Sequence, residues 1–184
     1  MSLEQIAPAV ESRGREDARH VSHLLFYGAI VGVLLIDQLS KAWVVENLSL
    51  YQPTDLVPWL APVLSFTSIR NTGVAFGLFQ GLGSFFAVFS ILVLVGVFAF
   101  RRTISPDDLR VHLSLGLVVG GALGNNIVDR LLRGHVVDFL DVNFWPLQNW
   151  PVFNIADSAI VVGVAVLLLD SLLAGGSGVS SDGD

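Results

Sequence analysis

Residues 135–169 read HVVDFLDVNFWPLQNWPVFNIADSAIVVGVAVLLL, a polar and aromatic segment that leads into a long apolar run. An α-helix rises about 1.5 Å per residue, so roughly 20 apolar residues cross a hydrocarbon core about 30 Å thick. The segment from about Ile155 to Leu173 therefore predicts a membrane-spanning helix. Two acids, Asp138 and Asp157, lie at the edges of predicted spans. A charge at such a depth is costly unless it is paired or functional.

The composition of the whole chain agrees with a membrane protein. Of its 184 residues 53% are hydrophobic and 14% charged, and the mean hydropathy is +0.68. These values indicate one compact membrane domain. The net charge of -6 and the lack of a long basic run count against a nucleic acid partner. The chain has no cysteine, which excludes disulfides, a thiol nucleophile and cysteine-based metal sites.

Three further segments are long and apolar enough to span a bilayer, namely His23–Val45, Leu82–Phe100 and Val111–Leu132. The first is preceded by a polar lead of some twenty residues and is not followed by a small-residue cleavage site, so it is interpreted as a retained span rather than a signal peptide. With Ile155–Leu173 the sequence predicts four spans.

The basic residues predict the orientation of these spans. Arginines precede the first span and lie between the second and third: Arg13, Arg15, Arg19, Arg101, Arg102 and Arg110. The positive-inside rule places those regions, and with four spans both termini, in the cytoplasm. We expect residues 1–22 to form a cytoplasmic extension, residues 23–173 the membrane domain, and residues 174–184 a disordered acidic tail. Arg130 and Arg133 then lie at the outer end of the third span, against this bias.

The two outer segments, residues 46–81 and 133–153, carry further signals. Val63 to Arg70 alternates apolar and polar residues and is rich in β-branched types, which predicts a short strand at the membrane surface. Four tryptophans fall near span ends or in these segments, as an interfacial belt requires: Trp43, Trp59, Trp145 and Trp150. The expected fold is an all-α membrane protein with four transmembrane helices and a small extracytoplasmic, β-containing cradle.

Polar residues also occur within the spans. Asp37 and Lys41 stand four apart and share a helix face, either as an ion pair or in contact with a substrate. Asn126, Asp129 and Arg130 form one polar face, for which a buried hydrogen-bond network and direct chemistry both remain open. In the third span, glycines recur every four residues and predict close helix packing: Gly116, Gly120 and Gly124.

Asp138 and Asp157 allow two interpretations. Asp157 could be an ordinary first-turn acid favoured by the helix dipole, with Asn154 one turn before it, and Asp138 a solvated rim acid. Alternatively, two carboxylates in a partly desolvated cleft would share a proton, because like charges at close range cannot both ionise. One would then act as base toward a water while the other polarises a carbonyl.

Four blocks, in this order, are similar to the motif set of the bacterial lipoprotein signal peptidases, or signal peptidase II: DQLSK (37–41), RNTGVAFG (70–77), GGALGNNIVDRLLRGHVVDF (120–139) and FNIADSAI (153–160). The resemblance covers roughly residues 24–173. It implies an aspartic endopeptidase of the bacterial inner membrane that cuts prolipoproteins just before a lipid-modified cysteine. It also implies membrane lipid and the prolipoprotein as partners, a monomer, and no metal or other cofactor.

The resemblance assigns roles by motif. Asp138 and Asp157 would be the catalytic pair. Substrate-binding roles would fall to Asn71, Asn126, Arg130 and Asn154, and supporting roles to Asp37, Lys41 and Asp129. Asp129 is expected to be supporting rather than catalytic because its neighbour Arg130 offers it an ionic partner. The family pattern is Gly-Asn-x-x-Asp-Arg, whereas GNNIVDR has one extra residue. Helical phase favours Asn126 as the residue that faces the site, while a local bulge would bring Asn125 inward instead.

Two other classes of membrane protein, an ion-coupled transporter and a non-enzymatic scaffold, would use these polar residues differently. An ion-coupled transporter would place its polar residues near the midplane and show two related repeats. A scaffold would leave the two aspartates without a use. We also expect outer segment 46–81, with glycines at 73 and 77, to form a cradle and lid over the cleft.

Overall fold

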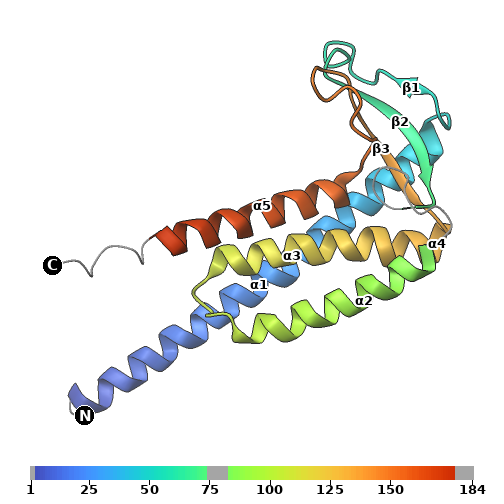
Figure 1. The fold of residues 1–184 in the computed structure, drawn as a ribbon. Helices are drawn as coiled ribbons and strands as arrows, with labels where there is room; N and C mark the ends of the chain where they lie inside the picture. Colours follow the sequence, from blue (N-terminus) through green and yellow to red (C-terminus); the bar gives the residue numbers. More distant parts are fainter. Residues whose placement is uncertain (1–2, 74–82, 177–184) are drawn as a thin grey trace.

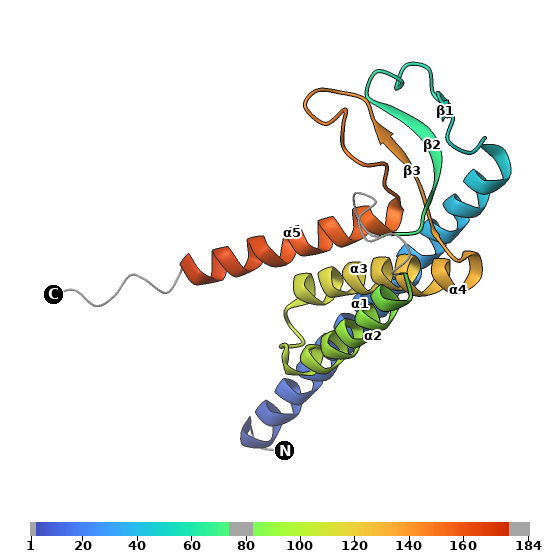
Figure 2. The ribbon, with the colours of Figure 1, turned by 45° about the vertical axis from the view of Figure 1, so that its right-hand side comes forward.

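The computed structural model describes residues 3–73 and 83–176. Long helices form a bundle, and a small sheet projects from one end of it (Figures 1 and 2). The long helices are α1 (Leu3–Asn47), α2 (Gly83–Phe100), α3 (Leu109–Leu123) and α5 (Ile155–Gly176). Shorter elements are β1 (Pro53–Thr54), β2 (Leu64–Asn71), η2 (Arg101–Thr103), η3 (Gly124–Asp129), α4 (Arg130–Arg133) and β3 (Val136–Val142).

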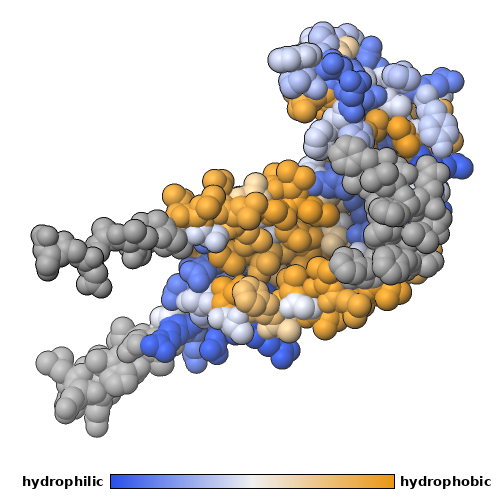
Figure 3. Space-filling model, in the orientation of Figure 1, coloured by the Kyte–Doolittle hydropathy of each residue, from blue (hydrophilic) through white to orange (hydrophobic). Residues whose placement is uncertain are grey.

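Three of the four predicted spans correspond to helices that are long and apolar enough to cross a membrane. Among the described residues, three helical stretches are long and apolar enough to cross a membrane: Arg13–Asn47, Leu109–Arg133 and Ile155–Leu173. The second predicted span corresponds to α2, whose 18 residues include no charged side chain. Apolar side chains cover the visible flank of the bundle, whereas the sheet is mostly polar (Figure 3).

Two helix ends differ from the expected boundaries. Helix α1 begins at Leu3 and runs without a break past residue 22, so the N-terminal extension continues the first span as helix. Helix α5 continues to Gly176, three residues into the segment expected to be a disordered tail. The rest of that tail, residues 177–184, lies outside the described residues.

Helix α3 lies against both α1 and α5, and its glycines explain how. A Cβ added at Gly116 would lie 2.5 Å from the carbonyl oxygen of Phe26, and one at Gly120 would lie 2.9 Å from Cβ of Val33. On another face, a Cβ at Gly121 would collide with the carbonyl oxygen of Ala156. The predicted role of the glycine stripe in helix packing is therefore confirmed, and the contacts lie within one chain.

The sheet is antiparallel, in the order β1-β2-β3. Strand β2 confirms the strand predicted at Val63 to Arg70. Strand β3 was not predicted, and it pairs with β2 so that Ile69 lies opposite Asp138. Gly134 makes this possible, because its φ of 73° turns the chain sharply from the end of α4 into β3.

Candidate active site

Asp138 and Asp157 lie side by side because β3 is tied to the start of α5. Leu140 in β3 forms a β-bridge with Phe153, which places the next residue, Asn154, beside Asp138. The Asn154 side chain donates to Oδ1 of Asp138 at 2.7 Å, and its backbone N–H donates to Oδ2 of Asp157 at 3.1 Å. One asparagine thus contacts both acids that the sequence pointed to.

Asn154 and Asp157 also form a reciprocal cap on α5. The backbone N–H of Asp157 donates to Oδ1 of Asn154 at 2.9 Å, while the Asp157 carboxylate accepts from the Asn154 N–H. This is the geometry of a capping box, which satisfies two amides that a helix start leaves without partners. Asp157 is therefore a first-turn acid, and the cap fixes the direction of its carboxylate.

Each carboxylate receives a second amide donor. Nδ2 of Asn71 at the end of β2 donates to Asp138 at 2.9 Å, and Nδ2 of Asn125 donates to Asp157 at 2.7 Å. Only 4% of Asp138 is exposed. Burial, and next the nearby charge of Asp157, raise the pKa of Asp138 to about 6, although the hydrogen bonds from Asn71 and Asn154 favour its ionised form.

Both acids line one cavity of about 840 Å³ between the sheet and the bundle. Its polar wall comprises Asn71, Asn125, Asn126, Arg130, Asp138 and Asp157. Its remaining wall is largely apolar and includes Val136, Pro151, Val152, Phe153, Ile160, Val161 and Val162. A ligand here would meet acids and amides at one side and hydrocarbon at the other, as small-molecule and peptide sites commonly provide.

Arg130 lies on the wall of this cavity. Its Nη2 donates to the carbonyl oxygen of Gly73, while its Nε is buried without a hydrogen-bond partner. This contact ties the end of α3–α4 to the chain that follows β2. The rest of the expected lid, residues 74–82 with the glycine at 77, lies outside the described residues.

The extra residue in GNNIVDR is absorbed by a π-helix, η3. This bulge turns Asn125 inward, where it is buried and bonded to Asp157. Helical phase alone had favoured Asn126, and that preference is wrong for the inner position because the segment does not keep α-helical periodicity. Asn126 is partly exposed on the cavity wall. Single-turn π-bulges are frequent at functional sites.

Lys41 fixes the orientation of the Asn125 amide. Its Nζ donates to Oδ1 of Asn125 at 2.7 Å, and Nδ2 of Asn154 donates to the same oxygen at 3.1 Å. Because the oxygen is held by two donors, the NH₂ group of Asn125 must face Asp157. Lys41 therefore acts on the acid pair through Asn125.

Asp37, Lys41 and Asp129 form one buried cluster behind the acid pair. Nζ of Lys41 lies 2.8 Å from a carboxylate oxygen of Asp37 and of Asp129, which confirms the predicted Asp37–Lys41 pair. The other oxygen of Asp37 accepts from the N–H of Ala156 at 3.0 Å, so α1 also caps α5. The cluster thereby links three helices at the depth of the acid pair.

The partners of Asp129 differ from the expected one. Arg130 was its expected ionic partner, yet Arg130 points to Gly73, and Asp129 instead pairs with Arg133 at 2.7 Å and with Lys41. Gln38 donates to Asp129 as well, at 2.9 Å. Sequence reasoning missed both Gln38 and Arg133. The i, i+4 spacing of Asp129 and Arg133 was the available signal for the second.

The chain is similar to known proteins over most of its length. The family profile described as "Signal peptidase (SPase) II" matches residues 29–173. The lipoprotein signal peptidase of Shewanella pealeana is 43% identical over 169 residues, covering 88% of this chain and 94% of the relative. That of Shewanella halifaxensis is 42% identical over 166 residues, with the same coverage.

Two solved structures have a similar fold. A bacterial membrane enzyme determined by the in meso method at 2.3 Å resolution superposes with a TM-score of 0.76 and 31% identity, over 89% of this chain and 94% of the other. A second such enzyme, at 1.9 Å, gives a TM-score of 0.70 and 32% identity, over 82% and 92%.

Proposed function

The chain belongs to the signal peptidase II family, a membrane-bound protease family that removes signal peptides from prolipoproteins, and on that premise we propose that Asp138 and Asp157 are its catalytic pair. The protein is then an aspartic endopeptidase that cuts just before the diacylglyceryl-modified cysteine. The observation that carries the proposal is the joint contact of both carboxylates with Asn154, at the polar wall of a cavity.

The mechanism follows from one proton shared by two acids. The raised pKa of Asp138 supports a pair that holds a proton near neutral pH, and the pair titrates as a unit. The ionised carboxylate takes a proton from water as the oxygen attacks the scissile carbonyl carbon, while the neutral carboxyl donates to the carbonyl oxygen. Collapse of the tetrahedral intermediate breaks the C–N bond, and the amine leaves with a proton from the pair.

The amides around the pair would position the substrate. Asn71 and Asn154 hold Asp138, and Arg130 and Asn126 occupy the cavity wall beside the peptide path. The apolar wall would contact the hydrophobic signal peptide and the acyl chains of the modified cysteine. Asp37, Lys41 and Asp129 would support this arrangement by fixing Asn125 and the start of α5.

The proposed topology has four spans in the bacterial inner membrane. Helices α1, α2, α3–α4 and α5 would each cross once, with residues 1–22 and 174–184 in the cytoplasm and residues 23–173 as the membrane domain. The sheet and the acid pair would then lie at the outer surface, where the lipid-modified cysteine of the substrate resides. Close packing of α3 against α1 and α5 in one chain supports a monomer.

Cleavage of a lipid-modified precursor peptide by the purified protein in detergent tests the proposal. We expect Asp138→Asn and Asp157→Asn each to lower kcat by at least about a thousandfold, because loss of one member of a catalytic unit removes most of its effect. The matched control is Asp141→Asn, on the same strand as Asp138, whose carboxylate accepts from Thr67 instead.

The proposal would be wrong if either variant of the pair kept near-wild-type activity. It would also fail if Asp141→Asn lost activity to the same degree, since that result would indicate a general need for charge on β3. Thermal unfolding of each variant, followed in the same detergent, separates loss of catalysis from loss of fold.

A further inference from the structure

Arg101 is a buried cation at the end of the bundle opposite the sheet. Only 9% of it is exposed, and its Cζ lies 4.2 Å from the ring centre of Phe26 and 5.4 Å from that of Tyr27. Its Nε and Nη2 atoms are buried and have no hydrogen-bond partner. Aromatic faces offset only part of the cost of burying a guanidinium, which ordinarily requires a counter-charge.

His112 is a second buried basic residue at this end of the bundle, and it has an unpartnered atom of its own. It is 3% exposed; Nε2 lies 3.1 Å from the carbonyl oxygen of Ser105, and Nδ1 is buried without a partner. Gly116, one turn after His112 in α3, packs against the backbone of Phe26. Ser105, which His112 contacts, lies four residues after Arg101, so both basic side chains lie at the same end of the bundle.

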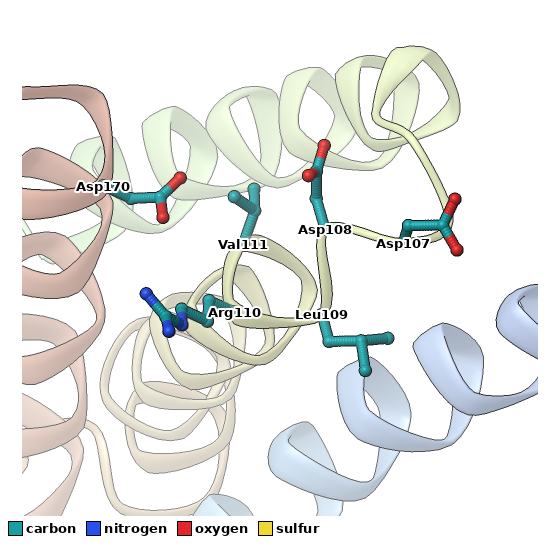
Figure 4. Close-up of a pocket in the computed structure, with 6 residues that line it drawn as sticks. All are labelled: Asp107, Asp108, Leu109, Arg110, Val111 and Asp170. Atoms are coloured by element: carbon teal, nitrogen blue, oxygen red, sulfur yellow. The ribbon is translucent and has the colours of Figure 1, made fainter. Parts of the chain in front are cut away.

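Neighbouring arginines differ from Arg101. Arg102 is exposed, as a residue that only anchors the chain at the membrane surface would be. Arg110 lines a separate cavity of about 280 Å³ together with Asp107, Asp108 and Asp170, and its side chain extends to the side where Asp170 of α5 lies (Figure 4). Asp170 is the acid toward which the Arg110 side chain extends, and none of the ion pairs found among the described residues includes Arg101.

We propose that Arg101 and His112 form a binding site for the phosphate group of an anionic phospholipid in the leaflet at this end of the bundle. A guanidinium offers paired donors that match phosphate oxygens, and the buried, unpartnered Nδ1 of His112 is a further polar atom at the same end of the bundle. Basic pockets between transmembrane helices are suited to lipid head groups. On the proposed topology this leaflet is the cytoplasmic one, but the site does not depend on the proteolytic activity.

The surroundings favour a lipid as the source of the phosphate. Large apolar side chains beside the site are exposed on α1 and α2, where acyl chains would lie: Leu24, Tyr27, Phe98 and Phe100. Tyr27 is half-exposed and its ring stands over the guanidinium, so a turn of this side chain would open the buried edge of Arg101 to the head group.

Native mass spectrometry of the full chain in detergent tests the proposal. The probes are dioleoylphosphatidylglycerol, dioleoylglycerol, which has the same chains without the phosphate, and inorganic phosphate. We expect phosphatidylglycerol to bind the wild type at least about tenfold more tightly than it binds Arg101→Gln, the loss expected for one charge-assisted contact. Arg102→Gln is the matched control and should bind like the wild type. Precursor cleavage in detergent should be unchanged in both variants.

Equal losses in the two arginine variants would overturn the proposal, because they would indicate a diffuse surface charge. Binding of dioleoylglycerol as tight as that of the phospholipid would overturn the phosphate contact, and inorganic phosphate that competes fully would overturn the lipid source. If Arg101→Gln does not fold, Arg101→Lys and His112→Phe take its place. Each should weaken phospholipid binding, and unchanged binding in both would overturn the proposal.

Discussion

At the scale of single residues, the buried acid pair carries a cost in stability. Asp138 is almost fully buried, and its pKa in the folded protein is about 6, above the ordinary value of 3.8. A raised carboxyl pKa means that the folded state prefers the neutral form. Asp138 therefore contributes its stability below pH 3.8, and that contribution is lost as the pH rises through about 6.

Replacement of Asp138 by asparagine should relieve this cost while it abolishes cleavage. The difference in Tm between Asp138→Asn and wild type should increase from pH 4 to pH 8, because only the wild type gains a buried charge over that range. The increase corresponds to at most about 3 kcal/mol, given a shift of roughly two pKa units. Thermal unfolding in detergent at both pH values measures it. Asp141→Asn should show no such change, and a pH-independent difference for Asp138→Asn would contradict the raised pKa.

The residue types of this site could be predicted because they are costly in a membrane protein. Asp138, Asp157 and Asn154 stand out at span edges, and the Asp37–Lys41 spacing indicated its ion pair. The partners of Asp129 could not be predicted in the same way. Arg130 follows Asp129 directly and Arg133 lies four residues after it, so by sequence either arginine could pair with Asp129. In the structure Arg130 donates to the carbonyl oxygen of Gly73 instead.

At the scale of elements, the π-helix η3 decides which asparagine touches the acids. Asn125→Ala should lower kcat by about a hundredfold or more, since it removes the donor to Asp157 and frees Lys41 from its amide contact. Asn126→Ala, its neighbour on the cavity wall, should cost less than about tenfold, as expected for a group that only lines the substrate path. Cleavage kinetics compare the two. The reverse order would mean that η3 reverts to an α-helix in the membrane.

The close contact of α3 with α5 offers a second prediction at this scale. Gly121→Ala would drive a methyl group into the carbonyl oxygen of Ala156, the residue before Asp157, so it should destabilise the protein by about 1–3 kcal/mol and slow cleavage. Gly28→Ala in α1 is the control, because a Cβ there meets nothing within 4 Å. Thermal unfolding and cleavage rates of both variants check the prediction. Equal effects on stability and cleavage at the two glycines would show that α5 shifts to accommodate the added methyl group without loss of stability.

Elements differed in how far the sequence predicted them. Long apolar runs located the helices, although α1 begins twenty residues before the predicted first span, and β2 followed from its alternation. Strand β3 was missed because Val136 to Val142 lacks a clear period, and its pairing with β2 depends on residues some 70 positions earlier in the chain. The choice between Asn125 and Asn126 stayed open because periodicity does not show where a helix accommodates one additional residue, which here forms the π-helix η3.

At the scale of the whole molecule, the buried cluster couples the packing of the helices to the geometry of the acid pair. Lys41 in α1 contacts Asp129 in η3 and Asn125, which contacts Asp157 in α5. The sheet adds Asp138 from outside the bundle through Asn154. The acid pair therefore assembles only when three helices and the sheet are in register, and this arrangement places the site at one end of the bundle (Figure 2).

Because the site lies at one end of the bundle, the topology can be tested. The chain has no cysteine, so an introduced cysteine is the only one in it that a thiol reagent can label. With single cysteines introduced, Gln52→Cys beside the sheet should react with a membrane-impermeant maleimide in intact bacteria, whereas Ser105→Cys should react only after permeabilisation. Both positions are exposed, so access to the reagent depends on the side of the membrane. Retained cleavage by each variant would show that the label reports on a folded enzyme. Labelling of Ser105→Cys in intact cells, with Gln52→Cys protected, would invert the orientation and place the acid pair in the cytoplasm, away from the lipid-modified cysteine of its substrate.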